Sequence, residues 1–174
     1  MAAPVLTTAR LVLRAHVLSD FERLCAIWGD PEIVRYIGGD VRSRSDCWMR
    51  LMRYHGLWPM LGYGYWAACD RETGHYLGDV GVADFHRELG ADFDATPEAG
   101  WVLARDAAGR GLATEAMGAI LAWCDAQGMA RTVCMIEDGN TASERVAARL
   151  GYRPFRAASL AWAPHTLFER DAAT

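Results

Sequence analysis

The stretch Ala108-Gly109-Arg110-Gly111-Leu112-Ala113-Thr114-Glu115 lies between a short apolar run and a long helical pattern. Glycine permits tight turns and lets a ligand approach the backbone closely. The first turn of a helix offers free N–H groups and a partial positive charge, which suit a phosphate group. A strand, a glycine-rich turn and a helix in this order therefore predict a cradle for a pyrophosphate. An ordinary glycine-containing helix start is the alternative interpretation.

Two common phosphate-binding loops do not fit this turn. A Walker A loop requires a lysine, and all 18 basic residues of the chain are arginines. A dinucleotide-binding G-x-G-x-x-G loop requires a third glycine where Thr114 stands. The turn therefore belongs to another class of site, or to none.

Helices and strands alternate downstream of the turn. A helix is predicted over Gly109–Gln127, because apolar residues recur along one stripe and Gly128 follows as a terminating glycine. The apolar run Thr132–Glu137 predicts a buried strand. A T-x-x-E capping box opens a further helix over Thr141–Leu150. Two short strands, around Tyr152–Ala157 and Leu160–Phe168, complete this part of the chain.

Upstream of the turn the pattern predicts two helices and four strands. In chain order they are a strand over Arg10–Val17, a helix capped by Ser19 and ending near Trp28, a helix capped by Ser43 or Ser45 and running to about Trp58, where Pro59 and Gly62 stop it, a hairpin of Tyr63–Cys69 with Tyr76–Phe85, and a strand over Glu98–Ala104. The acidic segment Arg87–Pro97 lacks periodicity and predicts a mobile loop near a substrate. The order β-α-α-β-β-β-α-β-α-β-β indicates an α+β (mixed α/β) fold.

Composition limits the class of protein. With 174 residues, 52% of them hydrophobic, the chain is expected to form one globular domain over residues 1–174. A net charge of −4 argues against nucleic-acid binding. Five irregularly spaced cysteines without a C-x-x-C pair predict buried reduced thiols and no metal site. The sequence contains no apolar run of about 20 residues, the length that a membrane-spanning helix needs, so we expect a cytoplasmic protein.

Several motifs together resemble one family, the GNAT acetyltransferases. Their motif A reads [QR]-x-x-G-x-[GA]; Gly111 and Ala113 match it, whereas Ala108 stands where Gln or Arg is expected. The run 113–116 (ATEA) is similar to the RimJ/RimL-like branch, the N-terminal acetyltransferases of ribosomal proteins. Further matches of that branch are Asn140-x-x-Ser143, Leu150-Gly151-Tyr152, Tyr63-Gly64-Tyr65-Trp66 with Leu77-Gly78, and Arg10-Leu11-Val12-Leu13-Arg14.

The resemblance implies a GNAT-like fold, a central and mostly antiparallel twisted sheet whose fourth and fifth strands splay apart. It implies direct transfer of acetyl from acetyl-CoA to an amine, either a protein N-terminus or a small molecule. The fourth strand is the one predicted over Glu98–Ala104, so the backbone of Trp101, Val102 and Leu103 would hold pantetheine. The N–H groups from the turn would bind the pyrophosphate; these residues are Gly109, Arg110, Gly111, Leu112, Ala113 and Thr114. We expect a monomer or a homodimer.

A general base assists deprotonation of the attacking amine. The family often places a glutamate near the start of the fourth strand, which makes Glu98 the first candidate; a solvated strand-end glutamate is the alternative. Asp84, His86 or an ordered chain of water molecules are further candidates.

A general acid for the leaving thiolate is harder to place. Many relatives use a tyrosine about seven residues after Asn140, but Ala147 stands at that position. Ser143 could hydrogen-bond the thiolate instead, or serve only as a helix-capping residue. Asn140 either contacts CoA or precedes the cap. Other candidates are Arg145 and Arg149 for the CoA 3′-phosphate, and Trp48 and Trp58 for the acceptor wall.

Two further hypotheses follow. The departures at Ala108 and Ala147 leave open a catalytically silent CoA- or ligand-binding sensor on the same fold. The acidic stretch Arg87–Glu98 would suit a cationic acceptor, or be a solvated loop.

Overall fold

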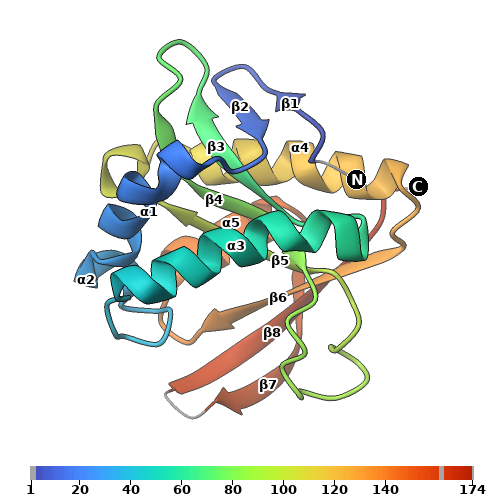
Figure 1. The fold of residues 1–174 in the computed structure, drawn as a ribbon. Helices are drawn as coiled ribbons and strands as arrows, with labels where there is room; N and C mark the ends of the chain where they lie inside the picture. The colour runs from blue at the N-terminus through green and yellow to red at the C-terminus, as the bar shows by residue number, and fades with distance from the viewer. Residues whose placement is uncertain (1–2, 161–162, 174) are drawn as a thin grey trace.

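The computed structural model describes residues 3–160 and 163–173, which form one eight-stranded sheet flanked by helices (Figure 1). Its order is β1-β2-β3-β4-β5-β6-β8-β7, and every printed pair is antiparallel except β5 with β6. The strands are β1 (Leu6–Thr7), β2 (Leu11–Arg14), β3 (Tyr65–Asp70), β4 (Tyr76–Ala83), β5 (Glu98–Leu103), β6 (Arg131–Glu137), β7 (Arg153–Leu160) and β8 (Ala163–Asp171).

Helices cover both faces of the sheet. They are α1 (Phe21–Trp28), α2 (Pro31–Val34), α3 (Arg44–Leu61), α4 (Leu112–Ala126) and α5 (Thr141–Arg149), with short 3₁₀ turns at Leu18–Asp20 and Arg105–Ala107. Figure 1 shows α3 crossing in front of the sheet and α4 behind it. Successive side chains of a strand point to opposite faces of the sheet, so each strand contributes core residues to both helical layers. On β3, Trp66 and Ala68 pack with the α4 layer, whereas Tyr65 and Ala67 pack with α1 and α3.

The predicted order of elements is confirmed, with a two-residue β1 and the short α2 added. Helix boundaries differ where the capping residue differs. Asp20, not Ser19, precedes α1, because the 3₁₀ turn takes up residues 18–20. Of the two residues predicted to stop α3, Gly62 ends the helix with a left-handed φ of 78°, whereas Pro59 lies inside it and the helix runs to Leu61. Asn140, not Thr141, caps α5.

The strands β5 and β6 part soon after they meet. Their one pair in register is Glu98 with Val133, supported by the N–H of Val133 donating to the Pro97 carbonyl at 3.0 Å. Each strand then follows its other neighbour, β4 or β8, so the two diverge toward Leu103 and Glu137. The splay implied for the fourth and fifth strands of the family is thus present, and it opens the sheet at its centre.

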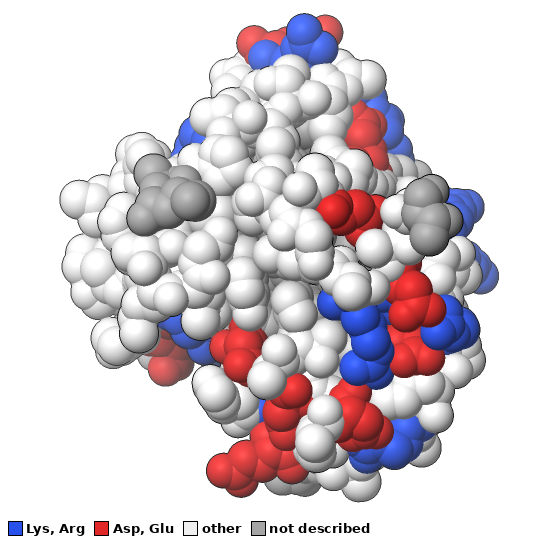
Figure 2. All heavy atoms as spheres, turned by 90° about the vertical axis from the view of Figure 1, so that its right-hand side faces the viewer, with Lys and Arg blue, Asp and Glu red and all other residues white. Residues whose placement is uncertain are grey.

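The acidic loop 84–97 is anchored rather than detached. Phe93 is buried against Val133 and Leu167. Asp92 forms a bidentate ion pair with Arg156 of β7, with N–O distances of 2.8 and 2.9 Å. Figure 2, which views the molecule from the right-hand side of Figure 1, shows acidic and basic side chains side by side over the lower right of that face. The carboxylate of Asp92 is therefore neutralised by the fold and not free for a cationic acceptor.

Candidate active site

The predicted pyrophosphate cradle begins α4. Gly109 and Gly111 have φ angles of 71° and 76°, in the left-handed region that disfavours a side chain. Gly111 occupies the N-cap position, and the N–H of Glu115 donates to its carbonyl at 3.1 Å. The N–H groups of residues 112–114 precede that first helical bond and so have no acceptor within the helix. They form a donor cluster at the positive end of the helix dipole.

One side-chain donor of this turn also lacks an acceptor. The hydroxyl oxygen of Thr114 is buried and has no hydrogen-bond partner among the described residues. A Cβ added to Gly109 would meet no atom within 4 Å, so open space faces the backbone there. An unpartnered hydroxyl, free N–H groups and an open approach together fit an anionic ligand.

The N-terminal strands hold this turn in place through Glu115. Its carboxylate accepts hydrogen bonds from the Thr8 hydroxyl at 2.6 Å, from the Arg10 N–H at 2.8 Å and from the Arg10 Nε at 2.7 Å. Arg10 also donates through Nη1 to the carbonyl of Arg110 at 2.9 Å. Partial burial would raise the pKa of Glu115, but the bonds from Thr8 and Arg10 hold it below its usual value. Glu115 is thus an anchor of the turn.

A cavity of about 580 Å³ opens where β5 and β6 separate. Its walls come from the end of α1, the α2–α3 connection, α3, β3, the segment after β4, β5, β6, the start of α5 and β8. Of the predicted site residues, it brings together Glu98, Trp101, Val102, Asn140 and Ser143. Leu103 and residues 109–114 are not among its lining residues. The turn and the cavity are therefore two separate features, as a long ligand that spans both would require.

Glu98 is the buried carboxylate of this cavity. It is 6% exposed, and both of its oxygens accept hydrogen bonds from Arg87, at 2.6 and 2.8 Å. Burial raises the pKa of Glu98, while Arg87 acts in the opposite direction without cancelling the rise. The alternative bases lie elsewhere: Asp84 and His86 are absent from the lining, and the His86 side chain is 84% exposed. A solvated strand-end glutamate is excluded by the burial.

The start of α5 contributes two polar side chains to the same cavity. The Asn140 side-chain oxygen accepts the N–H of Ser143 at 3.2 Å and so caps the helix. Because the cap uses the side-chain oxygen of Asn140, the amide N–H₂ of that residue is available to a ligand. The Ser143 hydroxyl is not needed for the cap. Asn140 and Ser143 therefore take part in the helix cap and also line the cavity, where a ligand can reach their side chains.

The two tryptophans proposed for the acceptor wall do not line the cavity, and the remaining candidates lie on α5 or in the core. Trp58 is 3% exposed and packs between Trp66 and Trp123, so it does not form an acceptor wall. Trp48 is 43% exposed on the outer side of α3 and lies outside the cavity. Tyr152 is buried and hydrogen-bonds Thr132, as expected for a core residue. On α5, Ala147 is fully buried, whereas Arg145 and Arg149 are exposed.

Sequence reasoning missed the side of the cavity formed by α3. Arg50, Arg53 and Tyr65 line it, together with Trp28 at the end of α1. The period of 3.6 places Arg50, Arg53 and Tyr54 on one face of α3, but nothing in the sequence shows that this face meets β5 across a cavity. A cluster of arginines in an amphipathic helix is typical of a solvated face, so the sequence pattern alone does not indicate a site.

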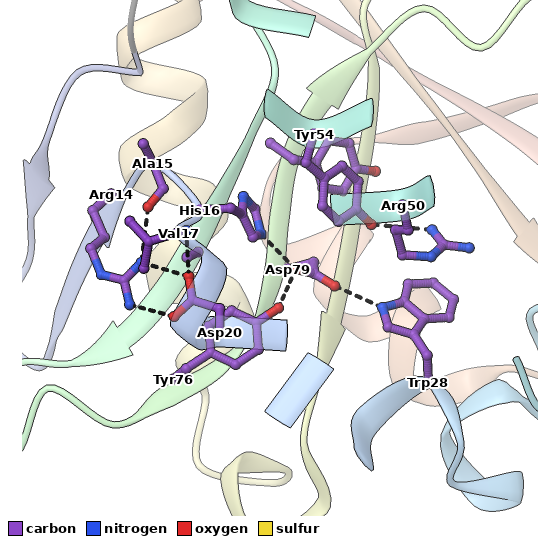
Figure 3. A network of polar contacts seen from close by, with 12 residues as sticks. Arg14, Ala15, His16, Val17, Asp20, Trp28, Arg50, Tyr54, Tyr76 and Asp79 are labelled. Carbon is purple, nitrogen blue, oxygen red and sulfur yellow. Dashed lines mark hydrogen bonds and ion pairs between the residues drawn. The ribbon is translucent and has the colours of Figure 1, made fainter. Parts of the chain in front are cut away.

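Beneath this wall lies a buried polar network, drawn in Figure 3. Asp79 of β4 is 0% exposed and accepts hydrogen bonds from the Trp28 Nε1 at 2.7 Å and from the Tyr76 hydroxyl. His16 shares the same carboxylate, with Nε2 at 2.7 Å from Oδ1. The Arg50 guanidinium lies 3.5 Å from the centre of the Trp28 ring. The network therefore fixes the ring on which Arg50 rests.

Within the described ranges, 3–160 and 163–173, no group of three or more His, Cys, Asp or Glu residues is arranged to hold a metal ion. The five cysteines form no disulfide, and four of them are buried. No helix in this part of the chain combines the length and apolar character of a membrane span.

Comparison with known proteins agrees with the geometry. The family model described as "Acetyltransferase (GNAT) domain" matches residues 10–153. The chain is 30% identical over 152 residues to the uncharacterized protein YkkB of Bacillus subtilis (strain 168), covering 84% of this chain and 83% of that protein. A Bordetella pertussis structure described as a GNAT-family acetyltransferase superposes with a TM-score of 0.86 at 34% identity, covering 97% and 99% of the two chains.

The RimJ/RimL-like branch is represented among the structural neighbours. RimL, a ribosomal L7/L12 α-N-protein acetyltransferase solved with coenzyme A, superposes with a TM-score of 0.75 at 15% identity, covering 97% of this chain and 98% of RimL. At that identity the likeness extends to the fold alone. The family match over residues 10–153 carries the assignment: the chain belongs to the GNAT acetyltransferase family and is an acyltransferase.

Proposed function

We propose that this protein transfers an acetyl group from acetyl-CoA directly to an amine, either a protein N-terminus or a small molecule. The observation that carries the proposal is a buried carboxylate, Glu98, in the cavity that opens between β5 and β6. The unpaired N–H groups at the start of α4 support it, because a CoA pyrophosphate is the anion that a GNAT fold brings there. The coenzyme A bound to the structural relative RimL is in keeping with this choice.

The residues present fit acetyl-CoA. The N–H groups of Gly109, Arg110, Gly111, Leu112, Ala113 and Thr114, with the unpartnered Thr114 hydroxyl, would hold the pyrophosphate. The backbone of Trp101, Val102 and Leu103 would hold pantetheine along the side of β5 that faces away from β4. Asn140 would contact the same ligand through its amide N–H₂. When bound, acetyl-CoA supplies the thioester that is attacked.

Glu98 then takes the proton that the amine loses during attack. Burial suits it to this task, because a carboxylate with a raised pKa is a stronger base than an exposed one. N–H groups of β5 that point into the gap stabilise the developing oxyanion. The Ser143 hydroxyl donates a hydrogen bond to the departing thiolate. Ala147 cannot supply a proton there, so the serine replaces the tyrosine of other relatives.

Release of CoA in the presence of an amine tests the proposal. Acetyl-CoA is expected to raise the melting temperature by an amount that grows with the logarithm of its concentration above Kd. A panel of amines is expected to contain some that accelerate CoA release. Tight binding of acetyl-CoA without stimulation by any amine would favour a silent sensor on the same fold.

Loss of the Glu115 anchor is expected to weaken acetyl-CoA binding. Glu115→Gln removes the carboxylate that Thr8 and Arg10 grip, so the turn must be ordered when the ligand binds. An ordering cost of about 1 kcal/mol corresponds to a roughly fivefold higher Kd for acetyl-CoA. Isothermal titration checks this. Glu72→Gln, in the exposed β3–β4 turn, is the matched control; equal Kd values for both variants would contradict the anchoring role.

Removal of the Ser143 hydroxyl is expected to slow the chemical step. Ser143→Ala keeps the cap, which uses the backbone N–H of residue 143. A hydrogen bond to a charged group is worth about 1.5 to 3 kcal/mol, so kcat should fall about 10- to 100-fold while the Kd for acetyl-CoA stays unchanged. Ser159→Ala on the exposed surface of β7 is the control. An unchanged kcat would leave Ser143 as a capping residue only.

A further inference from the structure

One wall of the cavity carries positive charge that the fold does not neutralise. Arg50 and Arg53 lie one turn apart on α3 and both line the cavity. Among the described residues, no carboxylate oxygen lies within 4.0 Å of either guanidinium group. Arg87, which lines the same cavity, is by contrast paired with Glu98. Because Arg50 and Arg53 line the cavity, their charge is available to an anionic ligand there.

Arg50 is held in position by neutral groups alone. Its guanidinium stacks over Trp28 and donates through Nη1 to the Tyr54 hydroxyl at 3.2 Å (Figure 3). Its Nε is buried and has no hydrogen-bond partner within the described chain. Burial acts to lower the pKa of Arg50, but Tyr54 and, less strongly, Asp79 raise it above its usual value. The oxygens of Asp79 are already engaged by His16, Trp28 and Tyr76. The geometry fixes a cation and leaves an N–H donor unused.

Arg53 adds a second cation at the mouth of the cavity. Its guanidinium lies 5.3 Å from the centre of the Phe85 ring and 5.9 Å from that of Tyr54. Partial desolvation, with repulsion from Arg50 and Arg87, lowers the pKa of Arg53. Two like charges held close to each other are unfavourable unless an anion joins them. An anion bound between Arg50 and Arg53 would relieve both the desolvation and the repulsion.

The acidic groups of the cavity do not serve that purpose. Glu98 is engaged by Arg87, and the other two lining carboxylates, Asp40 and Glu137, form no ion pair with either arginine of α3 in the described chain. The acidic loop that the sequence offered for a cationic acceptor directs Asp92 to Arg156 on β7 instead. The α3 wall of the cavity therefore favours an anionic group on the acceptor, whereas the sequence suggested a cationic acceptor.

We propose that the acceptor carries, besides its amine, an anionic group, a carboxylate or a phosphate, which Arg50 and Arg53 bind while the amine reaches Glu98. That the acceptor is an amine rests on the proposed function, whereas the anion site is argued only from the residues of α3. Guanidinium groups match both anions in geometry and donate to them in pairs. A cavity of about 580 Å³ suits a small molecule or the tip of a peptide.

A binding experiment tests the anion site without any turnover. The protein is first saturated with CoA, so that the start of α4 is occupied, and is then titrated with inorganic phosphate or with succinate while tryptophan fluorescence is followed. Trp28 under Arg50 and Trp101 in the same cavity are the expected reporters. We expect Arg50→Gln and Arg53→Gln each to raise the Kd of the anion about 10- to 100-fold. Arg44→Gln removes the same charge from the same helix at a position paired with Glu22, and should change little.

A second experiment uses matched acceptors and separates the two anions. Ethanolamine is compared with O-phosphoethanolamine, and amino acids are compared with their carboxamides, by CoA release from acetyl-CoA. The anionic member of at least one pair is expected to have the higher kcat/KM, and Arg50→Gln is expected to abolish that advantage. A preference confined to the phosphate pair identifies a phosphorylated acceptor, and one confined to the amino acids a carboxylate.

The outcomes distinguish the two proposals. The anion site would be overturned if the Kd of each anion, phosphate or succinate, were the same in Arg50→Gln and Arg53→Gln as in the wild-type protein, and if neutral amines were acetylated as well as anionic ones. The acetyltransferase function would then still stand. Arginine-dependent anion binding without CoA release from any amine would retain the site and overturn the proposed function.

Discussion

Replacement of Glu98 by glutamine is expected to lower kcat/KM for the acceptor amine about 100- to 10,000-fold, the range of a lost general base. Glutamine keeps the size of the side chain but cannot take a proton. The pH profile is the sharper measurement. A general base loses its activity when it is protonated as the pH is lowered. Because burial raises the pKa of Glu98, this loss in the wild-type enzyme should set in at a higher pH than it would for an exposed glutamate. Glu98→Gln should lose that acidic limb.

The Arg87→Gln variant separates a general base from a structural ion pair. Arg87 lowers the pKa of Glu98, so its removal raises that pKa further and moves the acidic limb to higher pH. An ion-pair role alone predicts the same defect in both variants and no displacement of the limb. Asp84→Asn tests the alternative base. Asp84 lies outside the cavity lining and its charge raises the pKa of Glu98, so this variant should keep the acidic limb and move it to lower pH. An acidic limb that persists in Glu98→Gln would assign deprotonation to water or another group.

Replacement of Asp79 by alanine is expected to destabilise the fold by about 3 to 5 kcal/mol. The carboxylate is fully buried and accepts from Trp28 and Tyr76, with His16 beside it. Its loss leaves these buried polar groups without a partner and leaves a cavity as well. Urea unfolding followed by circular dichroism measures the change. Because Trp28 supports Arg50, the same variant should also weaken phosphate binding in the CoA-loaded protein.

Asp79→Asn and Asp106→Ala calibrate that loss. Asparagine keeps one acceptor oxygen, so its cost should fall between those of wild type and Asp79→Ala. Asp106 is 60% exposed and pairs with Arg23 across the surface, where such pairs contribute at most about 1 kcal/mol. A free energy of unfolding for Asp79→Ala within that margin of wild type would show that the network does not stabilise the fold.

The fold was predictable because its signals are local. Alternating apolar residues, glycine-terminated helices and the turn before Leu112 each follow from backbone preferences over a few residues, and their order matches one family. The capping residues were less predictable. Asp20 displaced Ser19 because a 3₁₀ turn takes up residues 18–20 before α1 begins. Asn140 displaced Thr141 because neighbouring side chains can accept the same helix N–H and tertiary packing selects between them.

The site divides along the same line. The sequence by itself determined the α4 turn, the place of Glu98 at the start of β5 and the polar start of α5, because each belongs to one element and its boundary. Only the tertiary structure brought Arg50 and Arg53 opposite Glu98 and turned the acidic loop toward Arg156. Charge in a cavity depends on which side chains the fold pairs with one another, and that pairing joins residues tens of positions apart, which no local pattern records.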